Sequence, residues 1–463
     1  MELKVSGVNA STGARVMLPL LIVVATVAWL VGGVTADITF NDELIQLVGL
    51  PLLVVSIAGL LWQSHITFVQ SLALSVAALI ACVPLLQLLP LPIGLWLMPA
   101  PREVLATDLE LAGIALTGGS WSLMPSDTER SLWTLIPAMA LFLAALQLTE
   151  RHVRMTLRFV LGLVLANLAF SFFQVGLPPD SALRLYPNGG AGFGGVLRNG
   201  NHQASALMVG MSVGLGLAAD ARQRLKDGKE GGWHVWLYAT VSVICFAAIL
   251  LTRSTAGVIL AMVFFAAGCL ILASWSRRAQ LGQLLHRTGA VASIVLVLTG
   301  GFWAIRWMDL AQTEPLRYAL GKETWRIGAA HFPWGSGIGT FVPIFDQSAP
   351  ARLQADGYIN HAHNEFAQWW MTGGLLAVLA LSAALVLLAM VGWMLLRDRH
   401  RNALGVGCWL SVCAVLAHSW VDYPLRTLSL MSMTALVAGL SVAMASRAKS
   451  SKRRRRDAAP QRA

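Results

Sequence analysis

The sequence contains little charge. Of its 463 residues only 12% are Asp, Glu, Lys or Arg, about half the share that is usual in a soluble domain, and 56% are hydrophobic. The mean hydropathy of +0.65 agrees with this composition. These values exclude a water-soluble fold of this length, because such a fold needs a charged surface.

Cysteine is also scarce. The five cysteines lie inside apolar runs, where a thiol behaves as a small hydrophobic group. They are Cys82, Cys245, Cys269, Cys408 and Cys413. Their spacing provides neither a disulfide framework nor a C-x-x-C metal pair. A small-residue cleavage site is missing after the apolar residues 17–34, so we interpret that stretch as a retained first helix.

Apolar runs of about 20 residues are abundant, and each is long enough to cross a hydrocarbon core of about 30 Å as a helix. Helices satisfy their own backbone groups in lipid. We therefore predict an all-α polytopic integral membrane protein of about 12 transmembrane helices, with one transmembrane domain over residues 1–445. The predicted spans are 17–34, 44–62, 66–89, 131–148, 155–176, 204–219, 235–252, 256–273, 288–306, 367–396, 404–420 and 427–445.

The basic residues predict the orientation of these spans. With the N-terminus inside, most of the 34 Lys and Arg fall in cytoplasmic segments, although the outside loops are much longer. We interpret the tail 446–463 as a disordered, basic cytoplasmic stretch that is attracted to anionic lipid. The net charge of +11 is thus explained by membrane topology, and we expect no nucleic-acid partner.

Three long loops are predicted on the non-cytoplasmic side, at about 91–130, 177–203 and 307–366. They hold most of the Pro, Gly and acidic residues that the spans exclude. Loops of this length are usually functional or ordered by packing. The largest is predicted to be partly helical, so any chemistry is expected in these loops.

The most unusual string is Asn-His-Ala-His-Asn-Glu at 360–365, where the largest loop enters an apolar helix. Polar side chains at a lipid interface cost solvation unless they find a partner or ligand, and histidine suits proton transfer near neutral pH. One alternative is a helix cap at Asn360 or His361. Another is metal ligation by His361, His363 and Glu365, although no further residue completes a ligand set.

Several arginines recur at the outside ends of the spans. They are Arg198, Arg253, Arg317, Arg326 and Arg426. A single arginine at a membrane boundary often only extends its charged end into water. Several of them near one histidine would form a pocket for a diphosphate, because guanidinium groups match phosphate oxygens and stay charged.

Two other outside segments receive structural interpretations. Residues 190–195 formally fit G-x-G-x-x-G, but their flanks are membrane spans rather than a strand and a sheet-packed helix. We interpret them as a flexible re-entrant or surface loop. The turn at 418–426 contains charges of both signs, and a pairing of Asp422 with Arg426 gives it a supporting role.

At these residues the chain resembles the O-antigen ligase and polymerase superfamily, membrane glycosyltransferases that use polyprenyl-diphosphate-linked glycans. The motifs that carry the resemblance are HAHNEF at 361–366, TGGL at 372–375, PWGSGIGTF at 333–341, RNGNH at 198–202, RS at 253–254 and LPLP at 89–92. In topology the resemblance covers most of the chain, and in motifs it covers about 190–426.

The resemblance implies a GT-C-like fold in the bacterial inner (cytoplasmic) membrane, with both termini cytoplasmic and a periplasmic active site. It implies metal-independent transfer or polymerisation of glycan from an undecaprenyl-diphosphate-type donor onto an acceptor hydroxyl, without a cofactor. The product would be a surface polysaccharide, such as the O-antigen of lipopolysaccharide, a capsule or an exopolysaccharide. The partners would be the lipid-linked donor, a glycan or lipid-anchored acceptor, and membrane lipid.

The resemblance also implies roles for particular residues. His363 matches the presumed catalytic base. A further loop arginine of the family matches Arg317 or Arg326, and of these two we favour Arg326. The residues expected to contact the diphosphate or glycan are Arg198, Arg253, Arg317, Arg326, Asn201, His361 and Asn364.

Several alternatives stay open at this point. A ligase and a polymerase share the same architecture. A multi-span transporter or flippase of lipid-linked glycans would also have outside arginines, although transporters usually bind near the bilayer midplane through ionisable residues inside their spans. A noncatalytic scaffold in an envelope-assembly complex is the third reading.

Overall fold

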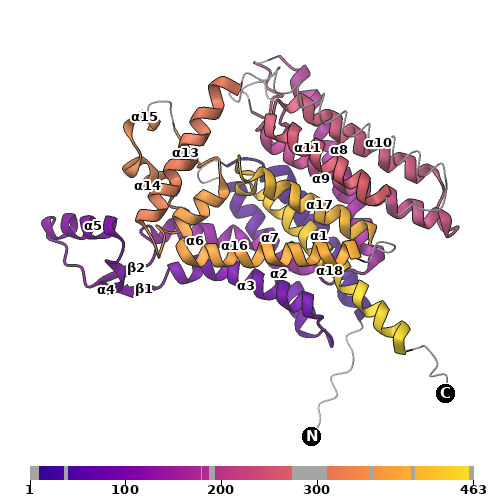
Figure 1. Cartoon of the computed structure of the whole chain (residues 1–463), viewed down its shortest axis with the longest axis horizontal. Coiled ribbons are helices and arrows are strands. Elements are labelled where there is room, and N and C mark those ends of the chain that lie inside the picture. The colour runs from indigo at the N-terminus through magenta and orange to yellow at the C-terminus, as the bar shows by residue number, and fades with distance from the viewer. Residues whose placement is uncertain are drawn as a thin grey trace, which may run out of the picture.

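The computed structural model describes residues 10–35, 40–178, 180–186, 193–273, 310–354, 358–397 and 402–457. Within this part of the chain almost all regular structure is helical, and eight helices are long and apolar enough to cross a membrane. The helices run roughly side by side as one bundle (Figure 1). The predicted all-α polytopic membrane fold is therefore confirmed.

The spanning helices match the hydropathy pattern. The long apolar helices are α2 (Phe40–Leu61), α3 (Phe68–Gln87), α8 (Glu150–Gly176), α9 (Gly200–Lys226), α10 (Trp233–Ile249), α11 (Thr255–Ala273), α16 (Glu365–Arg397) and α18 (Leu428–Asp457). The shorter ones are α1 (Ala10–Val31), α7 (Leu135–Ala145) and α17 (Ala403–His418). Each predicted span within the described ranges coincides with one of these helices, and the predicted span 288–306 lies outside them.

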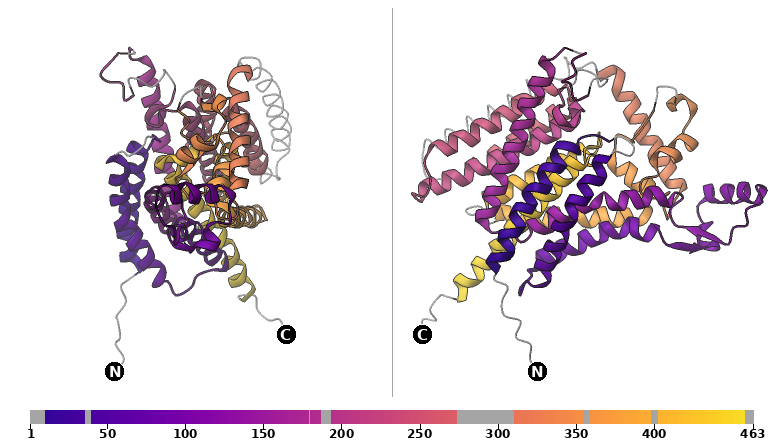
Figure 2. Two further views of the ribbon diagram at one scale, coloured as in Figure 1. Left: turned by 90° about the vertical axis from the view of Figure 1, so that its left-hand side faces the viewer. Right: turned by 180° about the vertical axis from the view of Figure 1, so that it is seen from behind.

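The remaining elements belong to the loops. They are β1 (Pro90–Pro92), α4 (Ile93–Trp96), α5 (Ala100–Leu111), β2 (Gly118–Ser120), α6 (Pro125–Trp133), η1 (Gly195–Leu197), η2 (Leu250–Thr252), α13 (Leu310–Ala330), α14 (Phe341–Ser348), α15 (Ala351–Gln354) and η4 (Pro424–Arg426). Strands β1 and β2 pair antiparallel. Figures 1 and 2 show α13 to α15 gathered at one end of the bundle, here called the loop-rich end, and α5 on a projecting arm.

Helix α9 lies at the centre of the half of the bundle that carries α8, α10, α11 and α17. Most of its residues are buried. Its glycines allow neighbouring backbones to approach closely, since a Cβ at Gly216 would lie 3.1 Å from the Cα of Gly407 on α17. Small residues have this role in lipid, where burial of apolar groups gives no preference for helix contact. Helix α9 is thereby packed closely against α17.

Helix α16 bends where two of the sequence motifs meet. Gly374 has non-helical angles of φ 59° and ψ −146°. The bend leaves carbonyl groups without helical partners, and the N–H groups of Ser336 and Gly337 donate to the carbonyls of Met371 and Thr372 at 3.0 and 2.8 Å. The loop that begins at 333 is therefore fixed against the first turns of α16, which carry the histidine motif at their start.

Replacement of Gly374 by alanine is expected to lower the free energy of unfolding by about 2 kcal/mol or more, because these angles are strained for any residue with a Cβ. A Cβ there would also collide with the carbonyl oxygen of Pro333. Thermal unfolding in detergent measures the effect. Gly162→Ala in α8 is the matched control, since a Cβ at Gly162 meets nothing within 4 Å. Equal unfolding temperatures for the two variants would contradict this account of the bend.

Candidate functional site

His363 lies in the turn that leads into α16, with its backbone in the left-handed region (φ 52°). Its Nδ1 is 3.1 Å from the carbonyl oxygen of His361. Because a carbonyl oxygen only accepts, Nδ1 carries the ring proton and Nε2 holds the free lone pair. Burial lowers the pKa of His363 from its usual 6.5, although the charge of Asp422 opposes the shift. The side chain is thus a neutral imidazole that can accept a proton at Nε2.

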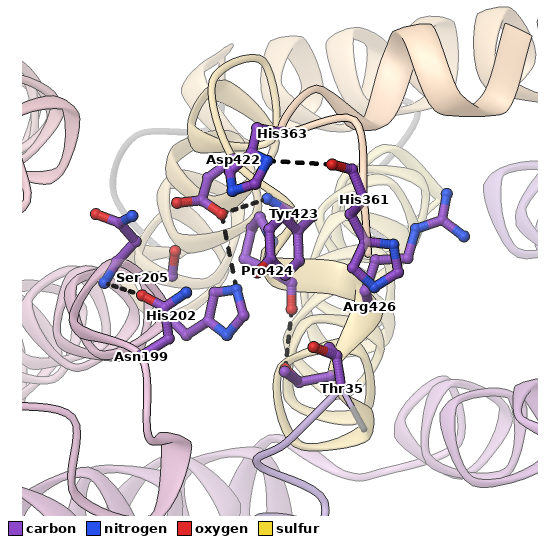
Figure 3. A network of polar contacts seen from close by, with 12 residues as sticks. Thr35, Asn199, His202, Ser205, His361, His363, Asp422, Tyr423, Pro424 and Arg426 are labelled. Carbon is purple, nitrogen blue, oxygen red and sulfur yellow. Dashed lines mark hydrogen bonds and ion pairs between the residues drawn. The ribbon is translucent and has the colours of Figure 1, made fainter. Parts of the chain in front are cut away.

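The turn between α17 and α18 brings a buried carboxylate to this histidine (Figure 3). Asp422 is fully buried. Its Oδ1 lies 3.7 Å from Nε2 of His202, and its Oδ2 lies 3.8 Å from Nη1 of Arg317. Burial opposes ionisation, but the neighbouring His202 and Arg317 outweigh it and hold the pKa of Asp422 below its usual range. Asp422 is therefore a charged carboxylate beside His363.

Tyr423 joins three histidines. The centroid of its ring lies 4.6 Å from that of His361, 4.9 Å from that of His363 and 5.0 Å from that of His202. Burial raises the pKa of Tyr423, so its phenol stays neutral at physiological pH. The hydroxyl interacts with the side chain of Asn199, which precedes α9. The ends of α9, α16 and α17 therefore meet around one tyrosine ring, as Figure 3 shows.

Two residues of the histidine motif have structural roles at the start of α16. Asn364 caps the helix, with its Oδ1 accepting from the N–H of Ala367 at 3.0 Å. Glu365 turns into the protein, where its Oε2 lies 3.6 Å from Nε of Arg426. The expected pairing of Asp422 with Arg426 is therefore wrong. Arg426 pairs with Glu365 because the turn at 424–426 places its side chain on the α16 side.

His361 is also held by protein groups. Its Nδ1 lies 3.2 Å from Nε2 of Gln368. Burial, together with the charge of Arg426, lowers the pKa of His361 well below its usual 6.5, so the ring is neutral. In the described part of the chain there is no group of three or more His, Cys, Asp or Glu side chains that could hold a metal ion.

Arg198 and Arg253 share an uncommon backbone conformation with His363. Their φ angles are 56° and 58°, and these three are the non-glycine residues with positive φ in the described ranges. Such a conformation costs roughly 1 to 3 kcal/mol for a residue with a Cβ, and it persists where the surrounding structure enforces it. The chain therefore accepts backbone strain at the histidine and the two arginines that the sequence motifs singled out.

The two arginine segments lie side by side at the start of α9. A Cβ at Gly200 would collide with the carbonyl oxygen of Thr252, so the residue two positions after Arg198 is in direct contact with the residue before Arg253. The guanidinium of Arg198 lies over the ring of Tyr186, 5.8 Å from its centroid. Both arginine side chains are exposed. Their charges therefore face outward.

The first turn of α9 connects these arginines to the cluster. The N–H of Asn201 donates to Oδ1 of Asn199 at 2.9 Å, which caps the helix. The next residue, His202, is buried against Asp422. The side chain of Asn201 is only partly buried, next to these groups in sequence. The RNGNH motif thus supplies an exposed arginine, a helix cap and a buried imidazole within five positions.

Arg317, rather than Arg326, reaches the cluster. Arg317 approaches Asp422, whereas Nε of Arg326 lies 2.7 Å from Oε1 of Glu323 and its Nη2 donates to the carbonyl of Ser348 at 3.0 Å. The two arginines are nine positions apart, about two and a half turns, and therefore lie on opposite faces of α13. The preference for Arg326 is not supported by this geometry.

Alanine at Arg317 is expected to slow the reaction at this site by up to about fivefold, because a charge pair that is partly open to solvent contributes up to roughly 1 kcal/mol. The side chain of Arg317 is 31% exposed. Initial rates with purified protein measure the change. Arg326→Ala, on the same helix, serves as the control and should change the rate less than about twofold. The reverse order of effects would return the assignment to Arg326.

Sequence reasoning did not place His202, His418, Asp422 and Tyr423 in the candidate site. Nδ1 of His418, at the end of α17, lies 2.7 Å from Oγ of Ser205, so it too belongs to the buried network. The available signal was the density of titratable and aromatic residues in the short turn after His418. That turn looked like a simple pairing of charges because its contact with α9 is not visible in the sequence.

Residues 240–382 match the family model of the O-antigen ligase. The match includes Arg253, Arg317, His361 and His363, and it confirms the resemblance to the O-antigen ligase and polymerase superfamily. No curated protein matches the sequence. The O-antigen ligase match supports a membrane enzyme of glycan processing in polysaccharide biosynthesis.

Proposed function

We propose that this protein is a membrane glycosyltransferase that transfers or polymerises glycan from a polyprenyl-diphosphate-linked donor onto an acceptor hydroxyl. The observation that carries the proposal is the shared backbone strain at His363, Arg198 and Arg253, which lie just before α16, α9 and α11. Strain of this kind clusters at active sites, where it presets the geometry of reacting groups. The O-antigen ligase match supports the same reaction class.

In this mechanism His363 is the general base. Its Nε2 takes the proton from the acceptor hydroxyl as that oxygen attacks the anomeric carbon of the donor sugar. The bond from the anomeric carbon to the diphosphate oxygen breaks, and its electron pair leaves with the polyprenyl diphosphate. Asp422 stabilises the imidazolium that forms, because its charge favours the protonated ring. The proton is released to water once the product departs.

The arginines stabilise the leaving diphosphate. The proposal assigns to the site the guanidinium groups of Arg198, Arg253, Arg317 and Arg426, together with the buried carboxylates of Asp422 and Glu365. Two positive charges are thus left in excess, and a diphosphate diester carries two negative charges. Guanidinium groups match phosphate oxygens and remain charged at any relevant pH. They can stabilise the growing charge without a metal ion.

The proposal includes a periplasmic position for the site in a bacterial inner membrane, with both termini cytoplasmic. Basic side chains at the opposite ends of the helices support this orientation, among them Arg154, Arg158 and Arg224. Labelling of single cysteines introduced at 253 and at 397 with a membrane-impermeant reagent tests it. We expect labelling of intact cells at 253 alone.

Product formation by the purified protein tests the enzyme assignment. Protein in lipid nanodiscs, supplied with a polyprenyl-diphosphate glycan and an acceptor, is expected to release polyprenyl diphosphate and form a new glycosidic bond. Movement of the donor across liposomes without product would indicate a flippase instead.

In a deletion strain, loss of all long chains from their anchor indicates a ligase, and single repeat units that remain attached indicate a polymerase.

The pH dependence of transfer follows from the pKa of His363. Only the neutral imidazole accepts a proton, and its pKa is lowered from 6.5, so the rate should be constant above about pH 6.5 and fall in more acidic solution. Asp422→Asn removes the charge that raises this pKa. We therefore expect Asp422→Asn to be slower than the unmodified protein, and its rate to begin to fall at a lower pH. An acid limb above pH 7 in the unmodified protein would contradict this assignment.

A further inference from the structure

Three buried polar side chains lie where the second half of α8 packs against the first turn of α9, the turn that also carries His202. Asn167, Ser171 and Gln203 are each at most 3% exposed. Asn167 is nine residues before the end of α8, about 13 Å into the helix. Buried polar groups on helices that cross a membrane are costly unless they find partners, and they often serve a function. Nothing in the proposed transfer reaction uses these three residues directly.

Hydrogen bonds join these three side chains. Nδ2 of Asn167 donates to Oε1 of Gln203 at 2.6 Å, and Nε2 of Gln203 donates to Oγ of Ser171 at 3.2 Å. The hydroxyl of Ser171 donates to the backbone carbonyl of Asn167 at 2.8 Å. Together with a bond from the backbone N–H of Val196 to Oδ1 of Asn167, these bonds give every polar atom of the three side chains a partner. A fully satisfied polar network of this kind is rigid.

One bond of the network leaves the helices. Oδ1 of Asn167 accepts from the backbone N–H of Val196 at 2.9 Å. The backbone carbonyl of Val196 accepts from the hydroxyl of Tyr186 at 2.8 Å. Gly195 has a φ of 57°, and a Cβ there would collide with Asn167. The backbone at 195–196 is therefore pressed against the network, two residues before Arg198.

The burial of side chains in the same loop agrees with this contact between Asn167 and the backbone at 195–196. Phe193, Val196 and Leu197 are buried, whereas Arg198 is exposed with a positive φ and its guanidinium lies over Tyr186. The part of the glycine-rich loop that the structure describes is thus fixed, in contrast to the flexible loop expected from the sequence. The direction of the arginine depends on where the backbone of Val196 is held.

We propose that Asn167 is a positioning residue that holds the loop 193–198, and through it the guanidinium of Arg198, in the geometry that binds the donor diphosphate. This inference rests on the proposed function, which assigns the diphosphate to Arg198. Asn167 acts through the backbone of the loop and does not touch the substrate. Its amide is suited to this position because it accepts from the loop and donates to Gln203 at the same time.

Two substitutions of similar size separate the roles of the amide. Asn167→Leu removes both hydrogen bonds, and we expect the apparent KM for the donor to rise about tenfold while kcat changes less than about threefold, because ground-state binding is lost. Asn167→Asp keeps an acceptor oxygen for the N–H of Val196 and should restore most of the affinity. Ser242→Ala, which removes a buried bond to the carbonyl of Met211, controls for loss of any hydrogen bond inside the bundle.

Hydrogen exchange distinguishes loop positioning from simple contact between α8 and α9. In Asn167→Leu we expect faster exchange in the peptide 193–199 and little change in the middle of either helix. Asn167→Asp should exchange like the unmodified protein. Unchanged exchange at 193–199 in Asn167→Leu would overturn the proposal, as would acceleration confined to the helices.

A double substitution tests whether the effect passes through Arg198. In an Arg198→Ala background, Asn167→Leu should change donor KM less than about twofold, because the positioned group is already gone. A full additional tenfold loss would overturn the proposal. If Arg198→Ala alone leaves transfer unchanged, the diphosphate role in the proposed function fails, whereas the hydrogen-exchange result still decides whether Asn167 anchors the loop.

Discussion

His363→Asn is expected to reduce glycan transfer by about 10²-fold to 10⁴-fold at normal protein levels, the range that a general base contributes. Asparagine is chosen because it adopts left-handed backbone angles readily, whereas alanine at φ 52° would add strain to the loss of the ring. The initial rate of product formation in nanodiscs, at pH 7.5 and with saturating donor, measures the effect. Donor binding should persist because the arginines are unchanged.

The control for this prediction is another buried histidine at the loop-rich end. His331 has its Nδ1 2.9 Å from the carbonyl of Ile327, a contact of the same kind as that of His363, but it does not belong to the cluster around Tyr423. His331→Asn is expected to lower thermal stability while the rate per folded molecule changes less than about threefold. Full transfer by His363→Asn would exclude His363 as the base.

Much of the fold was predictable because lipid restricts the possible structures. A run of about 20 apolar residues has few alternatives to a helix, so the predicted spans and the observed helices coincide wherever the chain is described. The histidine motif was also predictable, because polar side chains at 360–365 conflict with their apolar neighbours. Such a local conflict often marks a functional site.

The composition of the cluster could not be predicted from the sequence in the same way. His202 and Asp422 are 220 positions apart, and their contact depends on how α9 packs against α17. Helix packing in lipid is decided by small residues and close backbone contacts, which leave only a weak sequence pattern. The choice between Arg317 and Arg326 failed for a related reason, since hydropathy does not tell which face of α13 points toward the cluster.

Asn364 illustrates a further limit. The motif suggested a contact with the substrate, whereas its Oδ1 caps α16. A polar residue in front of an apolar helix fits both roles, since the helix start needs an acceptor for its free N–H groups. Only the hydrogen bond to the N–H of Ala367 separates the two readings. A role for Asn364 in glycan binding therefore stays a prediction.

Arg253→Asn is expected to reduce transfer by about 10²-fold to 10³-fold, the loss that follows removal of one donor to a developing negative charge. As at His363, asparagine suits the left-handed backbone, here with φ 58°. Arg253→Lys keeps a positive charge but loses the planar fork that binds two phosphate oxygens at once. We therefore expect its rate to lie between those of Arg253→Asn and the unmodified protein.

The salt dependence of these variants is a second test of whether Arg253 binds the donor. Arg253 is exposed, so its attraction to a diphosphate should weaken with ionic strength, and the donor KM of the unmodified protein should rise more steeply with salt than that of Arg253→Asn. Arg130, another exposed arginine, lies 3.8 Å from Asp127 in α6, and Arg130→Asn should retain the normal rate and salt response. Equal salt responses in Arg253→Asn and the unmodified protein would show that this guanidinium does not bind the donor. The diphosphate would then have to be bound by the arginines at 198 and 317, beside the same histidine cluster.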